Sequence, residues 1–272
     1  MKKIISLALI LIMVLSLVAC VDPQPSEPNT PTNPTNPTIS TTPTTSGNGK
    51  EDTTTKGEGV MTWAEYNAAE LNAEVVIEAY IQGKQAWWAK DGVGRGTFYL
   101  QDGVGGYLVY ELLCTEEEYN QLTVGTKVRL TGYKDMWQGE VEVVDATYEV
   151  LEGHYVAEAV DVTAKLGTAD IVDYQNMKVA FKGLTFVSLS YQGGARGKDI
   201  YVTLSYNGAQ YSFCVESYLT NADSDLYKAV EALKAGDIVD IEGFAYWYDE
   251  QNRTDAVYPE NINTHITSVT VK

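Results

Sequence analysis

The chain has 272 residues, of which 37 are acidic and 19 are basic, so its formal net charge at pH 7 is −18. Such a charge opposes binding to phosphate backbones and to anionic lipid surfaces, although it says nothing about the fold. Only three cysteines and two histidines are present, and no cysteine pair has ligand spacing, so the sequence predicts neither a metal site nor a cofactor.

Residues 1–20 indicate the compartment. Lys2 and Lys3 precede an apolar stretch, residues 4–18, which has the length of a signal-peptide core and is too short for a transmembrane helix. The segment then ends in Ala19-Cys20, an order that resembles the bacterial lipobox. This resemblance implies that Cys20 is acylated and anchors the protein to the bacterial cell membrane, outside the cytoplasm. The alternative is a signal peptide cut elsewhere, with Cys20 there by chance.

Residues 21–59 have a different composition. Seven of the eight prolines lie between Pro23 and Pro43, among Thr, Asn and Ser. Such a segment buries too little apolar surface to offset the entropy cost of ordering it. We therefore predict a disordered, extended tether that lifts the folded part off the membrane.

The remaining residues, 60–272, are enough for one large domain or two smaller ones, and they contain an internal repeat. The pattern Leu122-x-x-Gly125-x-x-Val128-x-Leu130-x-Gly132-Tyr133 matches Leu233-x-x-Gly236-x-x-Val239-x-Ile241-x-Gly243-Phe244. Further on, Asp145-Ala146-x-Tyr148 matches Asp255-Ala256-x-Tyr258, and His154 matches His265. A tandem duplication explains these matches, and it predicts two modules, at 60–152 and 153–272.

The first copy begins with a short helix capped by Thr62, with Glu65 in the position of a capping box. A second helix, between the third and fourth strands, begins after Thr115, with Glu118 in the same position, and Gly125 follows its end. Apolar residues alternate along the expected strands, which run through residues 75–81, 96–101, 107–111, 128–131 and 141–143.

The second copy repeats this order. Its helix is predicted at about 223–235, between its third and fourth strands. Its strands are predicted near 177–187, 199–205, 209–216, 237–247 and 253–258.

Three strands, a helix and two strands is the order of the OB-fold barrel. The fold class is therefore predicted to be all-β with short helices, as two tandem OB-fold-like five-stranded barrels. The chain resembles the OB modules of bacterial surface lipoproteins, which are also found alongside secreted nucleases. An immunoglobulin-like sandwich is the main alternative, but it would not place a helix at the same point in both halves.

Aromatic residues are abundant, with nineteen Tyr and five Trp. Several fall where OB barrels bind ligands, on the second and third strands and in the loops after the first and fourth. Flat rings in a groove can stack on sugars or bases. The candidate ligand-binding residues are Trp87, Trp88, Tyr99, Tyr107, Trp137, Tyr201, Trp247 and Tyr248. Alternatively, these rings fill the barrel mouths or form the interface between the two copies.

One of the adjacent pair Trp87 and Trp88 is expected to be exposed, because neighbouring side chains in an extended segment point in opposite directions. With Trp137 and Tyr99 it is predicted to form a stacking platform across the barrel mouth.

Other patterns favour structural interpretations. Cys114 and Cys214 lie in different halves at positions that do not correspond, which favours buried free thiols over a disulfide. Asn221-x-Asp223-x-Asp225 has the spacing that opens a calcium loop, but Leu226 occupies the position of the required Gly and Ala232 that of the required Glu, so helix capping is favoured. The two histidines recur at matching positions, which favours a structural role.

No nucleophile elbow, zinc-protease motif or phosphate loop is present, so the chain is predicted not to be an enzyme. The leading hypothesis is a lipid-anchored binding protein with a saccharide ligand. The alternatives are single-stranded nucleic-acid binding, associated with extracellular nuclease activity, and a structural or protein-docking module of the cell surface. The basic residues near the expected groove are few: Lys84, Lys90, Arg95, Lys127 and Arg129.

Overall fold

The computed structural model describes residues 56–248 and 259–272. Cys20, most of the predicted tether and the strand predicted at 253–258 lie outside the described residues. Within the described ranges, none of the helices combines the length and the apolar character needed to cross a bilayer.

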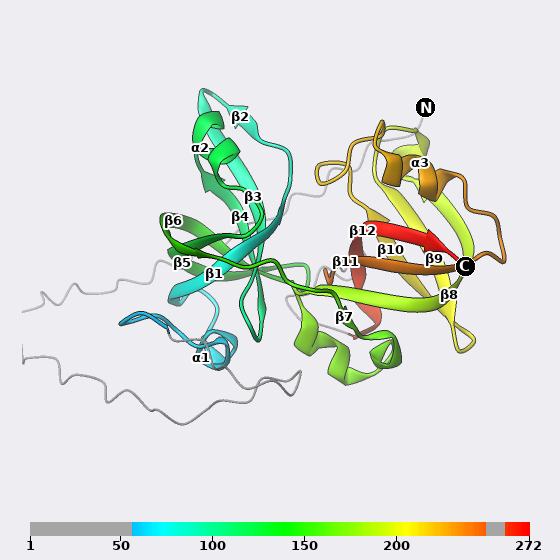
Figure 1. Cartoon of the computed structure of the whole chain (residues 1–272), viewed down its shortest axis with the longest axis horizontal. Coiled ribbons are helices and arrows are strands. Elements are labelled where there is room, and N and C mark those ends of the chain that lie inside the picture. Colours follow the sequence, from blue (N-terminus) through cyan, green and yellow to red (C-terminus); the bar gives the residue numbers. More distant parts are fainter. Residues whose placement is uncertain (1–55, 249–258) are drawn as a thin grey trace, which may run out of the picture. The chain divides into compact units, whose positions relative to one another are not determined.

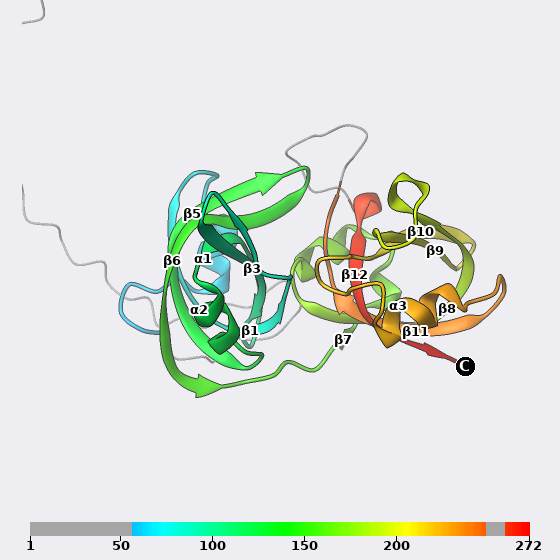
Figure 2. The same ribbon diagram turned by 90° about the horizontal axis from the view of Figure 1, so that it is seen from above.

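The first barrel is a sheet of six strands, five of which close on themselves (Figures 1 and 2). The closure arises because β1 pairs with β3 as well as with β5. All its pairings are antiparallel except that between β4 and β6, which is parallel. The strands are β1 (Glu74–Lys84), β2 (Trp88–Lys90), β3 (Val93–Gln101), β4 (Gly106–Leu113), β5 (Thr126–Trp137) and β6 (Glu140–His154).

The five closed strands of the second barrel have the same pairing scheme. Here β8 pairs with β9 and β11 to close the barrel, β10 and β12 form the parallel pair among the closed strands, and the extra strand β7 pairs in parallel with β8. Its strands are β7 (Val160–Asp161), β8 (Lys178–Tyr191), β9 (Ile200–Tyr206), β10 (Ala209–Val215), β11 (Ile238–Phe244) and β12 (Asn263–Val271). The predicted fold class, all-β with two tandem OB-like barrels, is confirmed.

Short helices connect the strands as the sequence predicts. In both barrels a helix lies between the third and fourth barrel strands. Thr62 and Thr115 each cap a helix through a complete capping box with the glutamate three residues on. The α-helices are α1 (Trp63–Ala68), α2 (Glu116–Gln121) and α3 (Asp225–Glu231), and the 3₁₀ turns are η1 (Thr163–Lys165), η2 (Ala169–Tyr174), η3 (Gln192–Gly194) and η4 (Pro259–Asn261).

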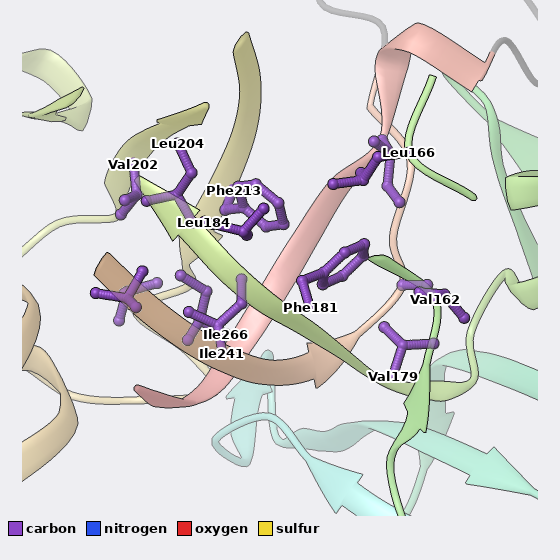
Figure 3. Packing of buried hydrophobic residues seen from close by; sticks show 14 of the residues in the cluster. Val162, Leu166, Val179, Phe181, Leu184, Val202, Leu204, Phe213, Ile241 and Ile266 are labelled. Atoms are coloured by element: carbon purple, nitrogen blue, oxygen red, sulfur yellow. The ribbon is translucent and has the colours of Figure 1, made fainter. Parts of the chain in front are cut away.

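Each barrel has its own apolar core, built from the residues that alternate along its strands. Val128 and Leu130 of β5 are buried, and so are Val239 and Ile241 of β11, which confirms the predicted strand faces. Figure 3 shows the second core, in which Phe181 and Phe213 meet edge to face with ring centroids 5.2 Å apart.

The repeated glycines have the same structural role in both barrels. Gly125 and Gly236 both have positive φ, which L side chains rarely adopt. The Gly125 N–H donates to the Ile81 carbonyl, and the Gly236 N–H donates to the Phe186 carbonyl. The helix-to-strand turn therefore has the same backbone conformation and the same kind of hydrogen bond in both barrels. At this turn the sequence repeat corresponds to a structural repeat.

The predicted equivalence of the two histidines is wrong. His154 is the last residue of β6 and lies opposite Thr126, whereas His265 is buried near the start of β12, opposite Cys214. The reason is the connection before the fifth strand, which spans residues 138–139 in the first barrel and 245–262 in the second. Equal spacing in the sequence therefore places the two residues at different heights of their barrels.

The end of the predicted tether belongs to the folded part. The Lys56 ammonium forms an ion pair of 2.6 Å with Asp102, and both side chains are buried. Lys56 also donates to the carbonyl of Glu78, at 3.2 Å. The tether boundary predicted after residue 59 is thus at least four residues too late, because a single lysine with a buried carboxylate partner is not visible in the composition of the segment.

The second barrel packs against the outer face of β3 in the first. The Tyr99 ring stacks on Phe244 with centroids 4.3 Å apart, and its hydroxyl lies 2.6 Å from Nδ1 of His265. Beside them the Lys178 N–H donates to the side-chain oxygen of Gln101, at 2.7 Å. The face on which OB barrels hold ligands is therefore partly covered in the first barrel.

Candidate ligand-binding groove

The adjacent tryptophans after β1 point in different directions, as predicted. Trp87 is half-buried, and its Nε1 donates to the Cys114 carbonyl at 3.1 Å. Trp88, in β2, is 37% exposed and lies opposite Arg95 of β3. The Trp88 ring is therefore exposed at the surface, whereas the hydrogen bond of the Trp87 indole holds the loop against the barrel.

Trp88 forms one side of a surface cavity of about 400 Å³, which we call the aromatic groove. Two further exposed rings line it: Tyr110 of β4 and Tyr218, which follows β10 in the second barrel. The complete lining is Gln85, Ala86, Trp88, Thr97, Tyr110, Glu111 and Tyr218. The groove thus combines three aromatic rings with a few polar groups, the composition expected of a small-molecule site.

The polar groups of the aromatic groove are arranged around Glu111. Its carboxylate lies 3.4 Å from Nε of Arg95, and the Arg95 guanidinium lies over the Trp88 ring, 5.1 Å from its centroid. Burial and the neighbouring Glu111 carboxylate raise the pKa of Tyr110 to about 12, so this phenol stays protonated at neutral pH. The groove therefore presents hydroxyl, amide and carboxylate groups beside its rings.

The second barrel supplies Tyr218 through a tightly held turn. The Glu216 carboxylate accepts hydrogen bonds from the backbone N–H groups of Tyr218 and Leu219, at 3.1 and 2.7 Å. The Ala86 N–H donates to the Tyr218 carbonyl at 2.6 Å, which joins the turn to the loop that carries Trp88. Two loops from different barrels are thus fixed side by side at the groove.

Trp137 and Tyr248 form a second, separate pair of rings. Trp137, at the end of β5, is 48% exposed, and its ring lies 5.5 Å from that of Tyr248. Neither residue lines the aromatic groove. The predicted platform is therefore divided: Trp88 gathers with Tyr110 and Tyr218, whereas Trp137 gathers with Tyr248.

Three candidate rings are buried and present no face to a ligand in this structure. Tyr99 lies between the barrels, stacked on Phe244, whereas the Trp247 ring is in the second core and its backbone N–H reaches Glu140, at 2.9 Å. Tyr107 is in the first core, and its hydroxyl donates to Asp102 at 2.9 Å. These positions match the alternative interpretation, in which such rings fill the barrel or the interface. Tyr201, on β9, is half-buried opposite Cys214.

Most of the predicted basic residues are engaged away from the aromatic groove. Lys84 donates to the Tyr119 carbonyl at 2.7 Å. Lys127 and Arg129 both bind the Glu78 carboxylate, at 3.0 and 2.7 Å. Arg95 is the candidate that lies beside the groove, and Lys90 is exposed on β2.

The remaining sequence candidates have structural roles. Cys114 and Cys214 are buried free thiols, as predicted. The acidic stretch before α3 surrounds a helix cap, but the capping side chain is Ser224, whose hydroxyl accepts from the Tyr227 N–H at 3.1 Å. Among the described residues, no group of three or more His, Cys, Asp or Glu side chains is placed to hold a metal ion.

Two groove residues were not found from the sequence. Tyr110 follows the outward alternation of β4, so the strand pattern contained a signal for it. Tyr218 lies in a turn of the second barrel, and only the contact between Ala86 and that turn reveals its position.

Comparisons with known proteins identify no family for the chain: no family model and no curated protein matches it. Among solved structures, a murine DNA-binding protein bound to double-stranded DNA is 7% identical, with 70% of this chain and 94% of that chain covered and a TM-score of 0.35. The Ifi202 HINa domain in complex with 20-bp double-stranded DNA is 10% identical, with 74% and 98% covered and a TM-score of 0.34. A replication protein A heterotrimer bound to single-stranded DNA is 12% identical, with 74% and 52% covered and a TM-score of 0.31. With TM-scores this low, these likenesses carry no argument about what this chain binds.

Proposed function

We propose that the chain is a non-catalytic, extracytoplasmic binding protein whose aromatic groove takes a saccharide. The observation that carries this proposal is the gathering of Trp88, Tyr110 and Tyr218 around one cavity of about 400 Å³. Exposed aromatic side chains that gather in this way on a soluble protein are characteristic of interaction sites.

The mixture of rings and polar groups suits a sugar. The apolar C–H face of a pyranose can lie flat on an exposed ring such as that of Trp88. The hydroxyl groups around the sugar can then bond to the Glu111 carboxylate and to the Tyr110 phenol, which stays protonated. The groove therefore offers both kinds of contact.

Charge favours a neutral ligand. Glu111 is the charged residue of the groove lining, and the nearest guanidinium, that of Arg95, is already paired with it. A phosphate backbone would meet this carboxylate within a chain of net charge −18. A neutral saccharide avoids that repulsion.

Single-stranded nucleic acid is the second candidate. OB barrels bind oligonucleotides as well as oligosaccharides on this face, and every base has a flat surface that can stack on Trp88. The observation in its favour is the Arg95 guanidinium over the Trp88 ring, which places a cation next to a stacking surface.

The site would be displayed outside the cell. Acylation of Cys20 would hold the chain at the membrane, and a polyproline-like tether over residues 21–55 would reach on the order of 100 Å. Replacing Cys20 with Ser should then abolish the incorporation of labelled fatty acid and leave unprocessed precursor or release it to the medium. Undiminished labelling of Cys20→Ser would refute the anchor.

The binding proposal is tested with a soluble form that begins at residue 21, probed on arrays of glycans and of single-stranded oligonucleotides. We expect hits among neutral glycans, and we expect Trp88→Ala and Tyr110→Ala to weaken them. Stacking on a nucleobase is worth about 1–3 kcal/mol per ring, and a similar scale for sugars gives roughly 5- to 150-fold in Kd.

The matched control is Tyr133→Ala, because Tyr133 is as exposed as Tyr110 but lies on β5, outside the groove. Its affinity should equal that of the wild type. Hits confined to oligonucleotides, with binding that weakens as salt rises, would replace the saccharide by nucleic acid. Binding that is unchanged in Trp88→Ala would place the site elsewhere. The absence of binding on both arrays would favour a protein-docking module.

A further inference from the structure

A second cavity lies at the other end of the first barrel, between α1 and the η2 turn. Its volume is about 280 Å³, and it shares no lining residue with the aromatic groove. The rings of Trp63 and Tyr66 form one wall, and Asp173 and Asn176 contribute polar groups from the other side. We call it the α1 cavity. Its volume lies close to the lower end of the range seen for small-molecule sites.

Two of its lining residues carry buried polar atoms that have no hydrogen-bond partner among the described residues. These are the hydroxyl of Tyr66 and the side-chain oxygen of Asn176, and each of the two residues is only 2% exposed. Buried polar groups are nearly always hydrogen-bonded in native proteins, because an unpaired one destabilises the folded state. Two such atoms around one cavity indicate a partner that binds there.

Behind these residues the Glu140 carboxyl is also incompletely bonded. One of its oxygens accepts from the Trp247 N–H and from Gln175, while the other has no partner among the described residues. Burial raises the pKa of Glu140 well above its usual range. The charged residues that line the α1 cavity are Lys134 and Asp173, whose formal charges cancel, so the lining has no net charge to attract a cation or an anion.

The lysine of the cavity is already saturated. The Lys134 ammonium donates to the carbonyls of Tyr66, Asn67 and Ala69, at 3.0, 2.9 and 2.8 Å. An ammonium has three hydrogens, so none is left for a ligand, and the cavity does not suit an anion. The same ammonium lies 5.2 Å from the centroid of the Tyr66 ring, where it repels a second cation.

The free groups define the ligand by elimination. The Asn176 amide nitrogen donates to the Val141 carbonyl at 2.9 Å, which leaves the amide oxygen to accept. The Tyr66 hydroxyl can both donate and accept. A matching ligand must donate hydrogen bonds without carrying charge, and it must present an apolar face to Trp63 and Tyr66. Hydroxyl groups on a small carbon skeleton meet all three requirements.

We propose that the α1 cavity is a separate binding site for a small neutral polyhydroxy compound, a monosaccharide or polyol. Its hydroxyl groups bond to the Tyr66 hydroxyl and the Asn176 oxygen, and its carbon skeleton lies against the Trp63 and Tyr66 rings. The site does not depend on the proposed role of the aromatic groove, because the two share no residue.

The test is calorimetric titration of the soluble chain with single monosaccharides and with glycerol, in wild type and in Tyr66→Phe. We expect at least one probe to bind wild type saturably and to bind Tyr66→Phe at least tenfold more weakly. Without ligand, Tyr66→Phe should be no less stable than wild type, because it removes an unpartnered buried hydroxyl.

Tyr133→Ala, at an exposed ring that lines neither cavity, is the matched control and should bind the probe as the wild type does. Binding that is lost in Trp88→Ala but unchanged in Tyr66→Phe would place the probe in the aromatic groove and overturn the α1 site, so failure of the groove and failure of the cavity are distinguishable. Val172→Phe, which fills the cavity from the η2 side, gives a second variant and should also abolish binding. The proposal is overturned if no probe binds, or if the folded variants Tyr66→Phe and Val172→Phe both bind with wild-type affinity.

Discussion

The two barrels have the same strand order and the same closure, and they differ in what lies on the outer face of the second and third strands. In the first barrel this face carries Tyr99, covered by the second barrel, and Tyr110, exposed in the aromatic groove. In the second barrel the corresponding outer face of β9 carries Tyr201, Thr203 and Ser205, which are half-buried. The interiors of the two barrels are therefore built in the same way from buried apolar residues, whereas their outer faces carry different side chains.

The largest effects are expected from truncating a buried side chain in the interior of each barrel. Leu130→Ala in the first barrel and Ile241→Ala in the second should each cost about 2–5 kcal/mol of unfolding free energy, because both remove buried methyl groups. Urea denaturation measures the cost. A loss below about 0.5 kcal/mol at either site, the range of surface substitutions, would mean that the two interiors are not equivalent.

Each barrel contains a buried glutamate that should make the stability of the fold depend on pH. Burial, with Asp135 and Glu111 nearby, raises the pKa of Glu142 to about 7. Burial likewise raises the pKa of Glu216 to about 7. In each case the folded state holds a proton that the unfolded state, with a pKa near 4.5, has lost. The contribution of each of these carboxyl groups to the free energy of unfolding is fully present below about pH 4.5, and it is lost as the pH rises to about 7.

Glu142→Gln should therefore raise stability at pH 8 by about 1–3 kcal/mol and flatten its pH dependence between pH 5 and pH 7. Glu216→Gln should gain less, because the Glu216 carboxylate also accepts two backbone N–H groups. Glu149→Gln is the control, since that side chain is exposed on the same strand as Glu142. Thermal unfolding across the pH range measures all three, and an unchanged pH profile in Glu142→Gln would contradict this account.

The contact between the barrels should have an effect of similar or smaller size. Tyr99→Phe keeps the stacking on Phe244 but removes the hydrogen bond to His265, which leaves a buried ring nitrogen unpaired. The expected cost is about 1–3 kcal/mol. Tyr133→Phe, at an exposed tyrosine of the same barrel, should cost nothing measurable. Equal stabilities of the two variants would show that the hydrogen bond between the barrels does not form in solution.

The smallest effect is expected at the tether. Deleting residues 21–55 should leave the thermal midpoint of the folded part unchanged, because we predict a tether there, and Lys56 makes the first packed contact within the described ranges. Lys56→Met, in contrast, leaves the buried Asp102 carboxylate without its cation and should cost about 3–5 kcal/mol. A drop of several degrees on deleting 21–55 would show that part of the tether packs against the barrels.

The sequence predicts the barrel interiors well, because alternation and glycine placement are local signals. Val128, Leu130 and Gly125 could be interpreted within one copy, and the repeat confirmed each interpretation in the other. The outer faces could not be predicted in the same way. Alternation shows that Tyr99 points outward, but nothing near it in the chain shows that Phe244 covers it.

The same limit explains the errors at the second barrel. The strand predicted at 253–258 lies outside the described residues, and β12 (Asn263–Val271) takes the fifth position among the strands that the structure describes, because spacing alone does not give the length of the segment before it. Tyr218 enters the aromatic groove because the two barrels meet, which is a property of neither copy by itself. Candidate residues inside one barrel were thus easier to place than those that depend on both.

The most direct test of the central claim follows the five tryptophan indoles by ¹⁵N NMR while a glycan from the array is added. Each indole reports on one region: Trp88 on the aromatic groove, Trp63 on the α1 cavity, Trp137 on its pair with Tyr248, and Trp247 on the core of the second barrel. We predict that the Trp88 signal shifts saturably, with Trp87 following as its neighbour, while the signals of Trp137 and Trp247 stay in place. A saturable shift of Trp137 with Trp88 unmoved would contradict the claim that the aromatic groove is the binding site.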